Sequence, residues 1–235
     1  MDTAPGALPK YIQISEMLIR RIAAGQLADG ARLPPERDMA TDLGISVGTL
    51  RKALADLADK RLLERVQGSG NYVRARAEVA SVYAFFRLEK VGGGGLPTAR
   101  VLTVDRLEKP AGAPEFGSAG QGHRIRRLRR LDDTVVALEE IWLDGSFDSF
   151  AFDDLSESLY LFYRHALGLV IGRIEDRIGV ATVPEWAPPD FSLPPGTAAG
   201  FIERTGWAQS GDPVEYSRTW FDYNKARYVS RIGKG

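Results

Sequence analysis

Two arginines and two glutamates in the second half of the chain have the types and spacing of an anion-binding site. Arg127 and Arg129 alternate with apolar residues in the segment 123–131, so both side chains lie on one face of a predicted strand. Paired guanidinium groups bind phosphate or carboxylate groups through parallel N–H donors. Glu139 and Glu215 each interrupt the apolar row of a later predicted strand. A carboxylate in such a row needs a partner, so we expect Glu139 to form a salt bridge with one of the arginines or to accept ligand hydroxyl groups.

The arginines also have a simpler interpretation as surface charge. Arginine side chains are usually exposed, and those of this strand would then pair with acidic neighbours such as Asp132 and Asp133 in the following turn. Spacing alone favours surface charge over an anion site. The opposite face of the strand, with Arg124, Arg126 and Arg130, is expected to face solvent.

A second set of polar residues lies on a predicted helix that begins after Ser46. Thr49, Arg51 and Lys52 project from its first turns, away from an apolar stripe. A helix that enters the major groove of DNA uses its first turns to reach base edges and phosphates. The polar hairpin tip 67–70 offers backbone amides that can approach a phosphate. These features favour DNA binding, although helical hairpins of a plain protein core are commoner in general.

The elements that carry this helix follow from local signals. Apolar residues recur at helical spacing over residues 11–24, which predicts a first helix. Pro34 and Pro35 open a short second helix, and Gly44 supplies the left-handed residue that ends it. Ser46 is placed to cap the next helix. The order helix, tight turn, helix and hairpin is typical of a DNA-binding module.

The second half of the chain has the pattern of a sheet with one strong helix. Leu155, Leu159, Phe162 and Ala166 form the apolar stripe of that helix, which is expected to stop at Gly168. The predicted strands are residues 99–105, 123–131, 135–143, 173–181, 199–208 and 214–222. One antiparallel sheet with helices on a face is an α+β arrangement.

Three segments are therefore expected in the whole chain. They are a winged helix-turn-helix domain at 1–74, a linker at 75–80 and an antiparallel-sheet domain at 81–235. Residues 1–76 hold 12 Lys/Arg and 9 Asp/Glu, a net charge of +3, and the remainder holds 19 and 22, a net charge of −3. A mildly basic N-terminal module fits nucleic-acid binding.

Composition excludes several other kinds of site. The chain has no cysteine, which rules out disulfides, thiolate zinc sites and cysteine nucleophiles, and its two histidines leave little room for a histidine metal site. We expect no metal and no cofactor. It lacks an apolar run of membrane-spanning length and a signal-peptide pattern, so a cytoplasmic protein without a membrane partner is expected.

The stretch LPPERDMATDLGISVGTLRKALADLADKRLLERVQGSGNYV resembles the winged helix-turn-helix of GntR-type bacterial transcription regulators, and the resemblance covers residues 10–74. It implies that Arg37, an arginine of the recognition helix (Arg51) and the wing glycine (Gly68) contact DNA. Val47 stands where the family usually has a first recognition-helix arginine. The residues predicted to bind DNA are Arg37, Ser46, Thr49, Arg51, Lys52, Gln67, Gly68 and Ser69.

The later motifs RLRRLDDTVVALEEIWL, SLYLFYRHALGL and LPPGTAAGFIERTGWAQSGDPVEYSRTWF resemble the UTRA effector domain of the HutC branch, whose fold is that of chorismate lyase. In sugar-phosphate-sensing members two arginines and a serine hold the phosphate, and carboxylates hold hydroxyl or amide groups. Two positions depart from the pattern: Tyr83-Ala84 lacks one usual hydroxyl, and Phe221 replaces a common tyrosine. The residues predicted to bind the effector are Arg127, Arg129, Glu139, Ser158, Glu215, Tyr83 and Ala84.

Together these features predict an effector-responsive transcription regulator that is not an enzyme. We expect a homodimer on a palindromic double-stranded DNA operator, acting as the repressor of a metabolic operon and modulated by a small anionic metabolite, a sugar phosphate or an organic acid. The alternative is a chorismate-lyase-like enzyme fused to a DNA-binding module. The chain has no G-x-S-x-G, H-E-x-x-H or P-loop motif, but lyases of that fold do not need one.

Overall fold

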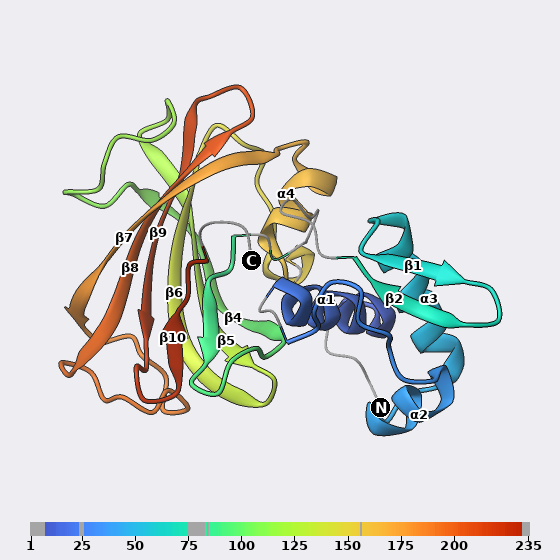
Figure 1. The fold of residues 1–235 in the computed structure, drawn as a ribbon. Coiled ribbons are helices and arrows are strands. Elements are labelled where there is room, and N and C mark those ends of the chain that lie inside the picture. Colours follow the sequence, from blue (N-terminus) through green and yellow to red (C-terminus); the bar gives the residue numbers. More distant parts are fainter. Residues whose placement is uncertain (1–7, 24–25, 75–82, 84, 156, 232–235) are drawn as a thin grey trace. The chain divides into compact units, whose positions relative to one another are not determined.

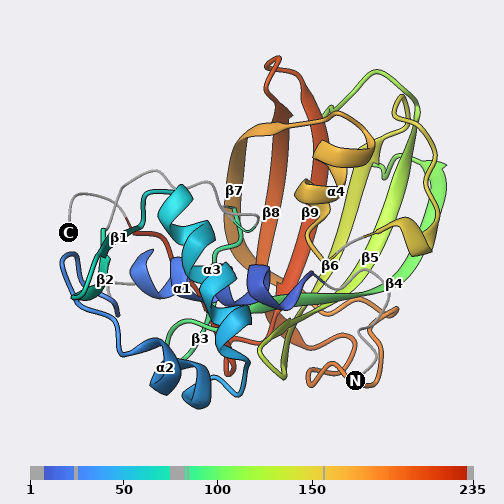
Figure 2. The same ribbon diagram turned by 90° about the vertical axis from the view of Figure 1, so that its right-hand side faces the viewer.

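The computed structural model describes residues 8–23, 26–74, 83, 85–155 and 157–231 of the 235-residue chain. The chain forms two compact units, which are described separately (Figures 1 and 2). One unit combines residues 8–96 with the residues from 229 onward, and the other spans residues 97–228. The predicted domain boundaries stay predictions, because the expected linker 75–80 lies outside the described residues.

The first unit contains the predicted helix-turn-helix and hairpin. Its elements are α1 (Lys10–Ala23), α2 (Glu36–Asp42), α3 (Val47–Asp59), β1 (Leu63–Val66) and β2 (Gly70–Val73). The hairpin β1–β2 is antiparallel and forms the wing. One core joins all of them: its fully buried members include Leu18 of α1, Leu50, Leu54 and Leu57 of α3, and Val73 of β2.

Local sequence explains how α3 is positioned. Gly44 has a φ of 61°, a left-handed conformation that glycine adopts easily, and it follows the end of α2. Ser46 caps α3 as predicted, because its Oγ accepts a hydrogen bond from the Thr49 amide at 3.1 Å. The buried stripe holds Leu50, Leu54 and Leu57, whereas Val47 is only half-buried. Because the stripe faces the core, the residues at the start of α3 are left at the surface.

An arginine fastens the end of this unit to its first helix. Arg20 of α1 donates hydrogen bonds to the backbone carbonyls of Gly95, Phe86 and Leu88, at 3.0, 3.1 and 2.6 Å. Leu88 begins the short strand β3 (Leu88–Lys90), which the sequence pattern did not predict. The backbone of residues 86–95 is thus bound to α1 through the side chain of Arg20.

The second unit is built on a six-stranded antiparallel sheet with the order β4-β5-β6-β9-β8-β7. All six predicted strands are present, most of them longer than expected. They are β4 (Pro97–Glu108), β5 (Gln121–Leu131), β6 (Thr134–Asp144), β7 (Ile171–Thr182), β8 (Ala198–Ala208) and β9 (Pro213–Phe221). The sequence pattern missed the 3-10 turn η1 (Phe152–Asp154) and the short β10 (Ala226–Tyr228). The predicted α+β fold is confirmed.

Helix α4 (Leu159–Ala166) lies against one face of this sheet (Figures 1 and 2). Ser158 caps its start, and Gly168, with a φ of 63°, follows its end as predicted. The predicted apolar stripe is partly wrong, because Leu155 precedes the helix and Ala166 is exposed. Tyr163 is fully buried instead, so the helix places an aromatic ring against the sheet.

The opposite face of the sheet is covered, which corrects the prediction that it faces solvent. Leu128, Leu138 and Trp220 on this face are buried in a cluster with Phe191 from the proline-rich segment 183–196. Arg126, Arg124 and Arg130 are half-buried rather than free in water. The guanidinium of Arg126 lies 4.6 Å from the ring centre of Trp186 in the same segment.

A bulge at the β5–β6 turn corrects a second prediction. Arg129 pairs with Ala137, but Arg130 pairs with Val135, so the register shifts by one residue. Val135 therefore leaves the face of Glu139, where strict alternation had placed it, and packs with the opposite cluster. Among the described helices, none has both the length and the apolar character needed to cross a membrane.

Candidate nucleic-acid interface and effector site

The predicted DNA-binding residues lie on the outer surface of the helix-turn-helix unit. Arg37 of α2, and Arg51 and Lys52 of α3, are exposed, and Thr49 is half-buried beside the cap residue Ser46. The hydroxyl groups of Ser46 and Thr49 lie 2.9 Å apart. Their position at the start of α3 is the one from which a recognition helix reaches base edges. We call Arg37, Ser46, Thr49, Arg51, Lys52 and the wing tip Gln67–Ser69 the recognition surface.

Arg51 is held by a surface ion pair that the sequence reasoning did not anticipate. Its Nε donates a hydrogen bond at 2.7 Å to Oε2 of Glu36, which is the first residue of α2. Arg65 of the wing donates to the backbone carbonyl of Arg51 at 3.4 Å. Arg51, in the second turn of α3, is thereby connected to α2 and to the wing. An exposed pair of this kind is weak, and Arg51 can exchange the carboxylate for an acceptor on DNA.

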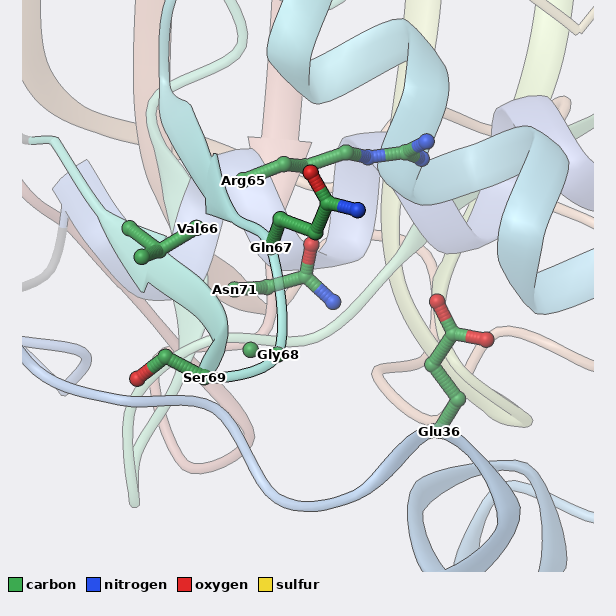
Figure 3. Close-up of a pocket in the computed structure, with 8 residues that line it drawn as sticks. Glu36, Arg65, Val66, Gln67, Gly68, Ser69 and Asn71 are labelled. Carbon is green, nitrogen blue, oxygen red and sulfur yellow. The ribbon is translucent and has the colours of Figure 1, made fainter.

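An open hollow separates the wing from the start of α2 (Figure 3). In the close-up, Gln67 and Asn71 extend from the wing on the side of the hollow that faces Glu36. Arg65 crosses toward α3, which adds a cation that sequence reasoning missed although it sits two residues from the wing tip. The hollow is lined by Glu36, Arg65, Val66, Gln67, Gly68, Ser69, Gly70 and Asn71.

Two glycines shape the wing tip. Gly68 and Gly70 have φ values of 74° and 133°, in the region that L side chains rarely adopt. A Cβ on Gly70 would lie 3.2 Å from the Nε of Arg32, whereas one on Gly68 would meet open space. The Oγ of Ser69 is 2.7 Å from the hydroxyl of Tyr72. The backbone at Gly68 is therefore unobstructed and available to a phosphate.

In the sheet unit, the face beneath α4 brings together the predicted arginine pair and Glu139. Arg127 Nη2 donates to Glu139 Oε2 at 2.7 Å, and Arg129 Nε lies 3.5 Å from Glu139 Oε1. All three residues are buried. The predicted salt bridge is confirmed, and the interpretation of these two arginines as surface charge is wrong. The register explains it, because Arg127 is directly opposite Glu139 across β5 and β6.

Glu139 is held as a carboxylate by its two partners. Burial by itself raises the pKa of Glu139, but the charges of Arg129 and Arg127 and the hydrogen bond from Arg127 outweigh it, and the pKa lies below the usual value. The group is thus an ionised acceptor inside the protein. Two guanidinium groups against one carboxylate leave an excess of positive charge at this place.

The N-terminus of α4 adjoins the same arginines. Arg127 Nη1 and Arg129 Nη1 both donate to the Glu157 carbonyl, at 3.4 and 3.3 Å, just before the cap residue Ser158. Ser158 is buried, and its Oγ accepts from the Leu161 amide at 3.4 Å. The first turn of a helix carries partial positive charge and favours anions. The predicted residues Arg127, Arg129 and Ser158 are therefore brought together.

Glu215 of β9 belongs to the same face and has the opposite character to Glu139. Tyr160 of α4 donates to Glu215 Oε1 at 2.8 Å. Burial raises the pKa of Glu215 above its usual value, against the opposing hydrogen bond from Tyr160 and the charge of Arg204. Glu215 Oε2 and Arg127 Nε are buried without a hydrogen-bond partner among the described residues. Polar atoms of Glu215 and of Arg127 on this face are thus left with bonding capacity that a water or a polar ligand can satisfy.

Arg204 of β8 is a charged neighbour that the sequence reasoning missed. It forms a two-pronged bond with Asp176 of β7, at 2.6 and 2.8 Å, and Tyr228 also donates to Asp176 at 2.7 Å. Arg204 pairs in register with Ser217 of β9, which places it on the face of Glu139 and Glu215. A lone arginine in a strand gives no spacing signal, so only the register reveals it.

Two predicted effector residues are not joined to this site by the structure. Tyr83 is buried, but it belongs to the other unit, and Ala84 lies outside the described residues. Their role stays a prediction. In the described part of the chain, no group of three or more His, Asp and Glu side chains is arranged to hold a metal ion.

Comparison with known proteins identifies both units. Residues 10–73 match the model described as bacterial regulatory proteins of the gntR family, and residues 93–227 match the UTRA domain. The HTH-type transcriptional regulator SmoD of Agrobacterium fabrum is 59% identical over 99% of this chain and 100% of its own length. This chain belongs to the GntR family of transcription regulators, in the branch that carries a UTRA domain.

More distant relatives and solved structures agree with this membership. The E. coli mannosyl-D-glycerate transport/metabolism system repressor MngR is 27% identical over 95% of the chain and 96% of its own. The B. subtilis repressor NagR is 26% identical over 96% of each chain. The crystal structure of B. subtilis YydK has the same fold, with a TM-score of 0.52 at 21% identity, covering 96% of this chain and 100% of its own.

Membership in the GntR family confirms part of what the sequence predicted. Members bind DNA through the helix-turn-helix and a small-molecule effector through the UTRA domain. The winged helix-turn-helix, the antiparallel effector domain and the function as a transcription regulator are therefore established. The individual contact residues on the recognition surface and beneath α4 remain predictions from geometry and resemblance.

Proposed function

We propose that this GntR regulator is a cytoplasmic repressor that binds a palindromic operator as a homodimer and responds to a small anionic metabolite. Two relatives that match almost its whole length are named as repressors. The observation that carries the effector class is the buried pair Arg127 and Arg129 at the N-terminus of α4. Sugar phosphates and organic acids both carry the required negative charge.

The charges beneath α4 favour an anion over a neutral or cationic ligand. Arg127 and Arg129 face the single carboxylate of Glu139, and Arg204 is matched by Asp176. Burial raises the pKa of Glu215 above its usual value, so the neutral form of this carboxyl is favoured relative to that of an exposed glutamate. The two guanidinium groups of Arg127 and Arg129 therefore outnumber the carboxylate that pairs with them, and their excess positive charge favours an anion. Glu139 and Glu215 accept hydroxyl or amide groups of the same ligand.

On DNA, the recognition surface divides into two roles. Thr49 and Arg51 at the start of α3 reach base edges, while Arg37, Lys52 and the wing backbone at Gly68 contact phosphates. One such module has modest affinity, and a two-fold dimer presents two recognition helices to two half-sites. The effector changes DNA affinity by binding the two states of the dimer unequally, with about 1–3 kcal/mol of coupling.

A thermal-shift screen with phosphorylated sugars and organic acids tests the effector class. A ligand that binds the native state raises the melting temperature, by an amount that grows with its concentration. Arg129→Lys keeps the charge but loses the planar fork, and we expect it to weaken this rise for an anionic hit. Arg124→Lys is the matched control, because Arg124 pairs with Asp105 at 2.8 Å on the opposite face of the sheet.

The same hit is then added to the protein bound to its operator, with fluorescence anisotropy as the measurement. Release of DNA by the hit supports a repressor, and an unchanged Arg129→Lys dose response contradicts the assignment of the anion site. A chorismate-lyase-like enzyme would instead convert the hit, which chromatography of the ligand after incubation detects. Recovery of unchanged ligand supports the regulator.

A further inference from the structure

The segment 30–33, which precedes α2, lies along the wing and carries an arginine that the recognition surface does not include. Arg32 pairs antiparallel with Tyr72 of β2. Backbone hydrogen bonds of 2.9 Å join β2 to the residues on both sides of Arg32. The backbone of Arg32 is therefore fixed beside the wing. Its side chain shares a face of the wing with that of Tyr72, because residues directly opposite in an antiparallel pair point the same way.

The wing has an inner face and an outer face, and Arg32 lies on the outer one. Leu63 of β1 and Val73 of β2 are buried in the core with α3, so their face is the inner one. Arg65 shares that face, two residues along β1 from Leu63, and reaches the backbone of α3 (Figure 3). Tyr72 alternates with Val73 and faces the other way, together with Arg32. Two arginines thus lie on opposite faces of the wing.

The guanidinium of Arg32 lies at the wing tip and is free to bind a ligand. A Cβ on Gly70 would lie 3.2 Å from Arg32 Nε and 3.7 Å from Arg32 Nη2, so the guanidinium lies against the glycine. Arg32 is exposed, and in the described part of the chain its side chain has neither an ion pair nor a hydrogen bond. Glu64, the carboxylate opposite Tyr72 on the same face, is bonded to Arg74 at 2.9 Å instead.

We propose that Arg32 enters the minor groove of DNA beside the wing tip and selects sites where that groove is narrow. This role rests on the DNA binding of the recognition surface in the proposed function. With α3 in the major groove, the wing tip reaches the phosphate backbone that borders it. That backbone separates the major groove from the minor groove. The outer face of the wing is turned away from α3, so it is the face that meets the minor groove.

A narrow minor groove suits a guanidinium at this position. Stiff A·T-rich segments have a narrow minor groove with an enhanced negative potential, which attracts arginine. A guanidinium is more weakly hydrated than an ammonium group, so it loses less on leaving water. The base edges of the minor groove carry little sequence information, so Arg32 reads the width of the groove. The selected DNA is therefore A·T-rich at base pairs that α3 does not contact.

Readout of groove width adds selectivity that α3 has in short supply. Val47, at the start of α3, has no hydrogen-bonding side chain. Arg51 is the single arginine of this helix and the side chain best suited to a guanine. Sequence-dependent shape gives specificity at positions that no side chain reads directly. An arginine in the minor groove thus complements a recognition helix with few base contacts.

Selection from a library of randomised DNA duplexes tests this role without a known operator. The full-length protein is incubated with the library, and the bound duplexes are sequenced. We expect the wild-type protein to enrich a half-site and, beside it, A·T over G·C pairs by about threefold to tenfold. Arg32→Gln should enrich the same half-site with a flanking preference below about 1.5-fold. Arg32→Lys keeps the charge and should retain more of the preference than Arg32→Gln.

Arg61→Gln is the matched control and removes the same charge from the same unit. Arg61 is exposed, precedes β1 and therefore lies at the end of the wing opposite to the tip. Its side chain, like that of Arg32, is unpaired among the residues that the structure describes. We expect the wild-type flanking preference in this variant. An equal loss of A·T preference in Arg61→Gln and Arg32→Gln would show that net charge produces it, and would overturn the role of Arg32.

Anisotropy titrations of the selected half-site with A·T or G·C flanks provide a second measurement. Arg32→Gln should weaken binding to the A·T-flanked duplex about threefold or more and change binding to the G·C-flanked duplex by less than about twofold. Equal weakening on both duplexes, with a shallower salt dependence, places Arg32 on a phosphate instead and overturns the proposal. Circular dichroism verifies that each variant is folded.

Two further outcomes separate this inference from the proposed function. A wild-type protein that enriches no sequence overturns the recognition surface and the role of Arg32 together. A wild-type protein that enriches a half-site without A·T pairs beside it overturns the role of Arg32 alone and leaves the proposed repressor in place.

Discussion

Arg51 and Arg127 make the same ion pair in two opposite environments. Arg51 meets Glu36 at 2.7 Å on the recognition surface, and Arg127 meets Glu139 at 2.7 Å beneath α4. The Arg51 side chain is 67% exposed, whereas that of Arg127 is 6% exposed. Geometry alone therefore does not distinguish the two pairs. Burial does, and it assigns them different functions.

The exposed pair can change partners, and the buried pair cannot do so without a large loss. A surface pair contributes about 0–1 kcal/mol, so a base edge of DNA can replace Glu36 as the partner of Arg51 at small cost. Removal of one partner from a buried pair leaves a charge without compensation, which typically costs about 3–5 kcal/mol. The Arg51–Glu36 pair can therefore give way to DNA, whereas the Arg127–Glu139 pair stays in place. The second arginine beside Glu139 provides positive charge for a ligand.

Arg127→Ala tests the buried side of this comparison and has the largest expected effect. It leaves the buried Glu139 with Arg129 alone, at 3.5 Å. We expect the free energy of unfolding to fall by about 3 kcal/mol, the lower end of the range for a broken buried pair. Urea denaturation monitored by tryptophan fluorescence measures it. The double variant Arg127→Ala with Glu139→Gln should recover part of the loss, because it removes the uncompensated carboxylate.

Arg100→Ala is the control for that measurement. Arg100 pairs with Asp190 at 2.6 Å in the same unit, and both side chains are about half exposed. Its removal should change the free energy of unfolding by less than about 0.5 kcal/mol. Equal losses for Arg100→Ala and Arg127→Ala would show that burial does not distinguish the two kinds of pair.

Arg51→Ala tests the exposed side, through DNA rather than stability. We expect the free energy of unfolding to change by less than about 0.5 kcal/mol. Binding to the operator should weaken by about 1–3 kcal/mol, because a base-edge contact of arginine is lost. Anisotropy titrations against operator DNA and against random DNA measure the specific and the non-specific affinity. A variant that binds the two DNAs with unchanged preference would place Arg51 on the phosphates rather than the bases.

Periodicity predicted much of this comparison, but not the environment that decides it. Alternation placed Arg127 and Arg129 on one face with Glu139 nearby, because strand geometry fixes which side chains share a face. Alternation does not say which face is covered. The segment 183–196 covers the other face, and the sequence shows its prolines but not where it packs. The prediction of a solvent face failed for that reason.

Two other errors have the same origin in long-range structure. Val135 changed face because of the bulge beside the β5–β6 turn, and a bulge has no signal in a simple apolar pattern. Arg204 reaches the effector face only through the pairing of β8 with β9. By contrast, Ser46 and Gly44 act on their own neighbours in the chain. Their roles were predicted correctly, because capping is a local property.

Ser46→Ala is a smaller test that joins the two properties on the recognition surface. The Ser46 Oγ accepts the Thr49 amide hydrogen at 3.1 Å, and its loss leaves that donor to water. We expect the free energy of unfolding to fall by about 1 kcal/mol. Ser46→Asp keeps an acceptor at the cap and should retain stability, while its negative charge near phosphates should weaken DNA binding. If Ser46→Asp lowers stability and DNA affinity to the same extent, Ser46 acts on DNA binding only through the fold.

The two buried carboxylates beneath α4 should give opposite pH dependences, the smallest effect expected here. The pKa of Glu215 is raised by burial, so its protonated form stabilises the folded state. That contribution is complete below the ordinary glutamate pKa and is lost as pH rises toward the folded pKa, because the unfolded chain ionises first. The pKa of Glu139 is lowered by its arginines, so its contribution is lost as pH falls through the folded pKa.

Glu215→Gln cannot ionise, and its unfolding free energy should therefore lack the decline of the wild-type protein above the ordinary glutamate pKa. Glu139→Gln should instead lack the decline on the acid side and be less stable near neutrality, where its arginines have lost their carboxylate. Urea titrations between about pH 4 and pH 8 compare the three proteins through the slope that proton linkage predicts. Parallel profiles for wild type and Glu215→Gln would mean that Glu215 is ionised in the folded state. The site would then be close to neutral, and the argument for an anionic effector would rest on the arginine geometry alone.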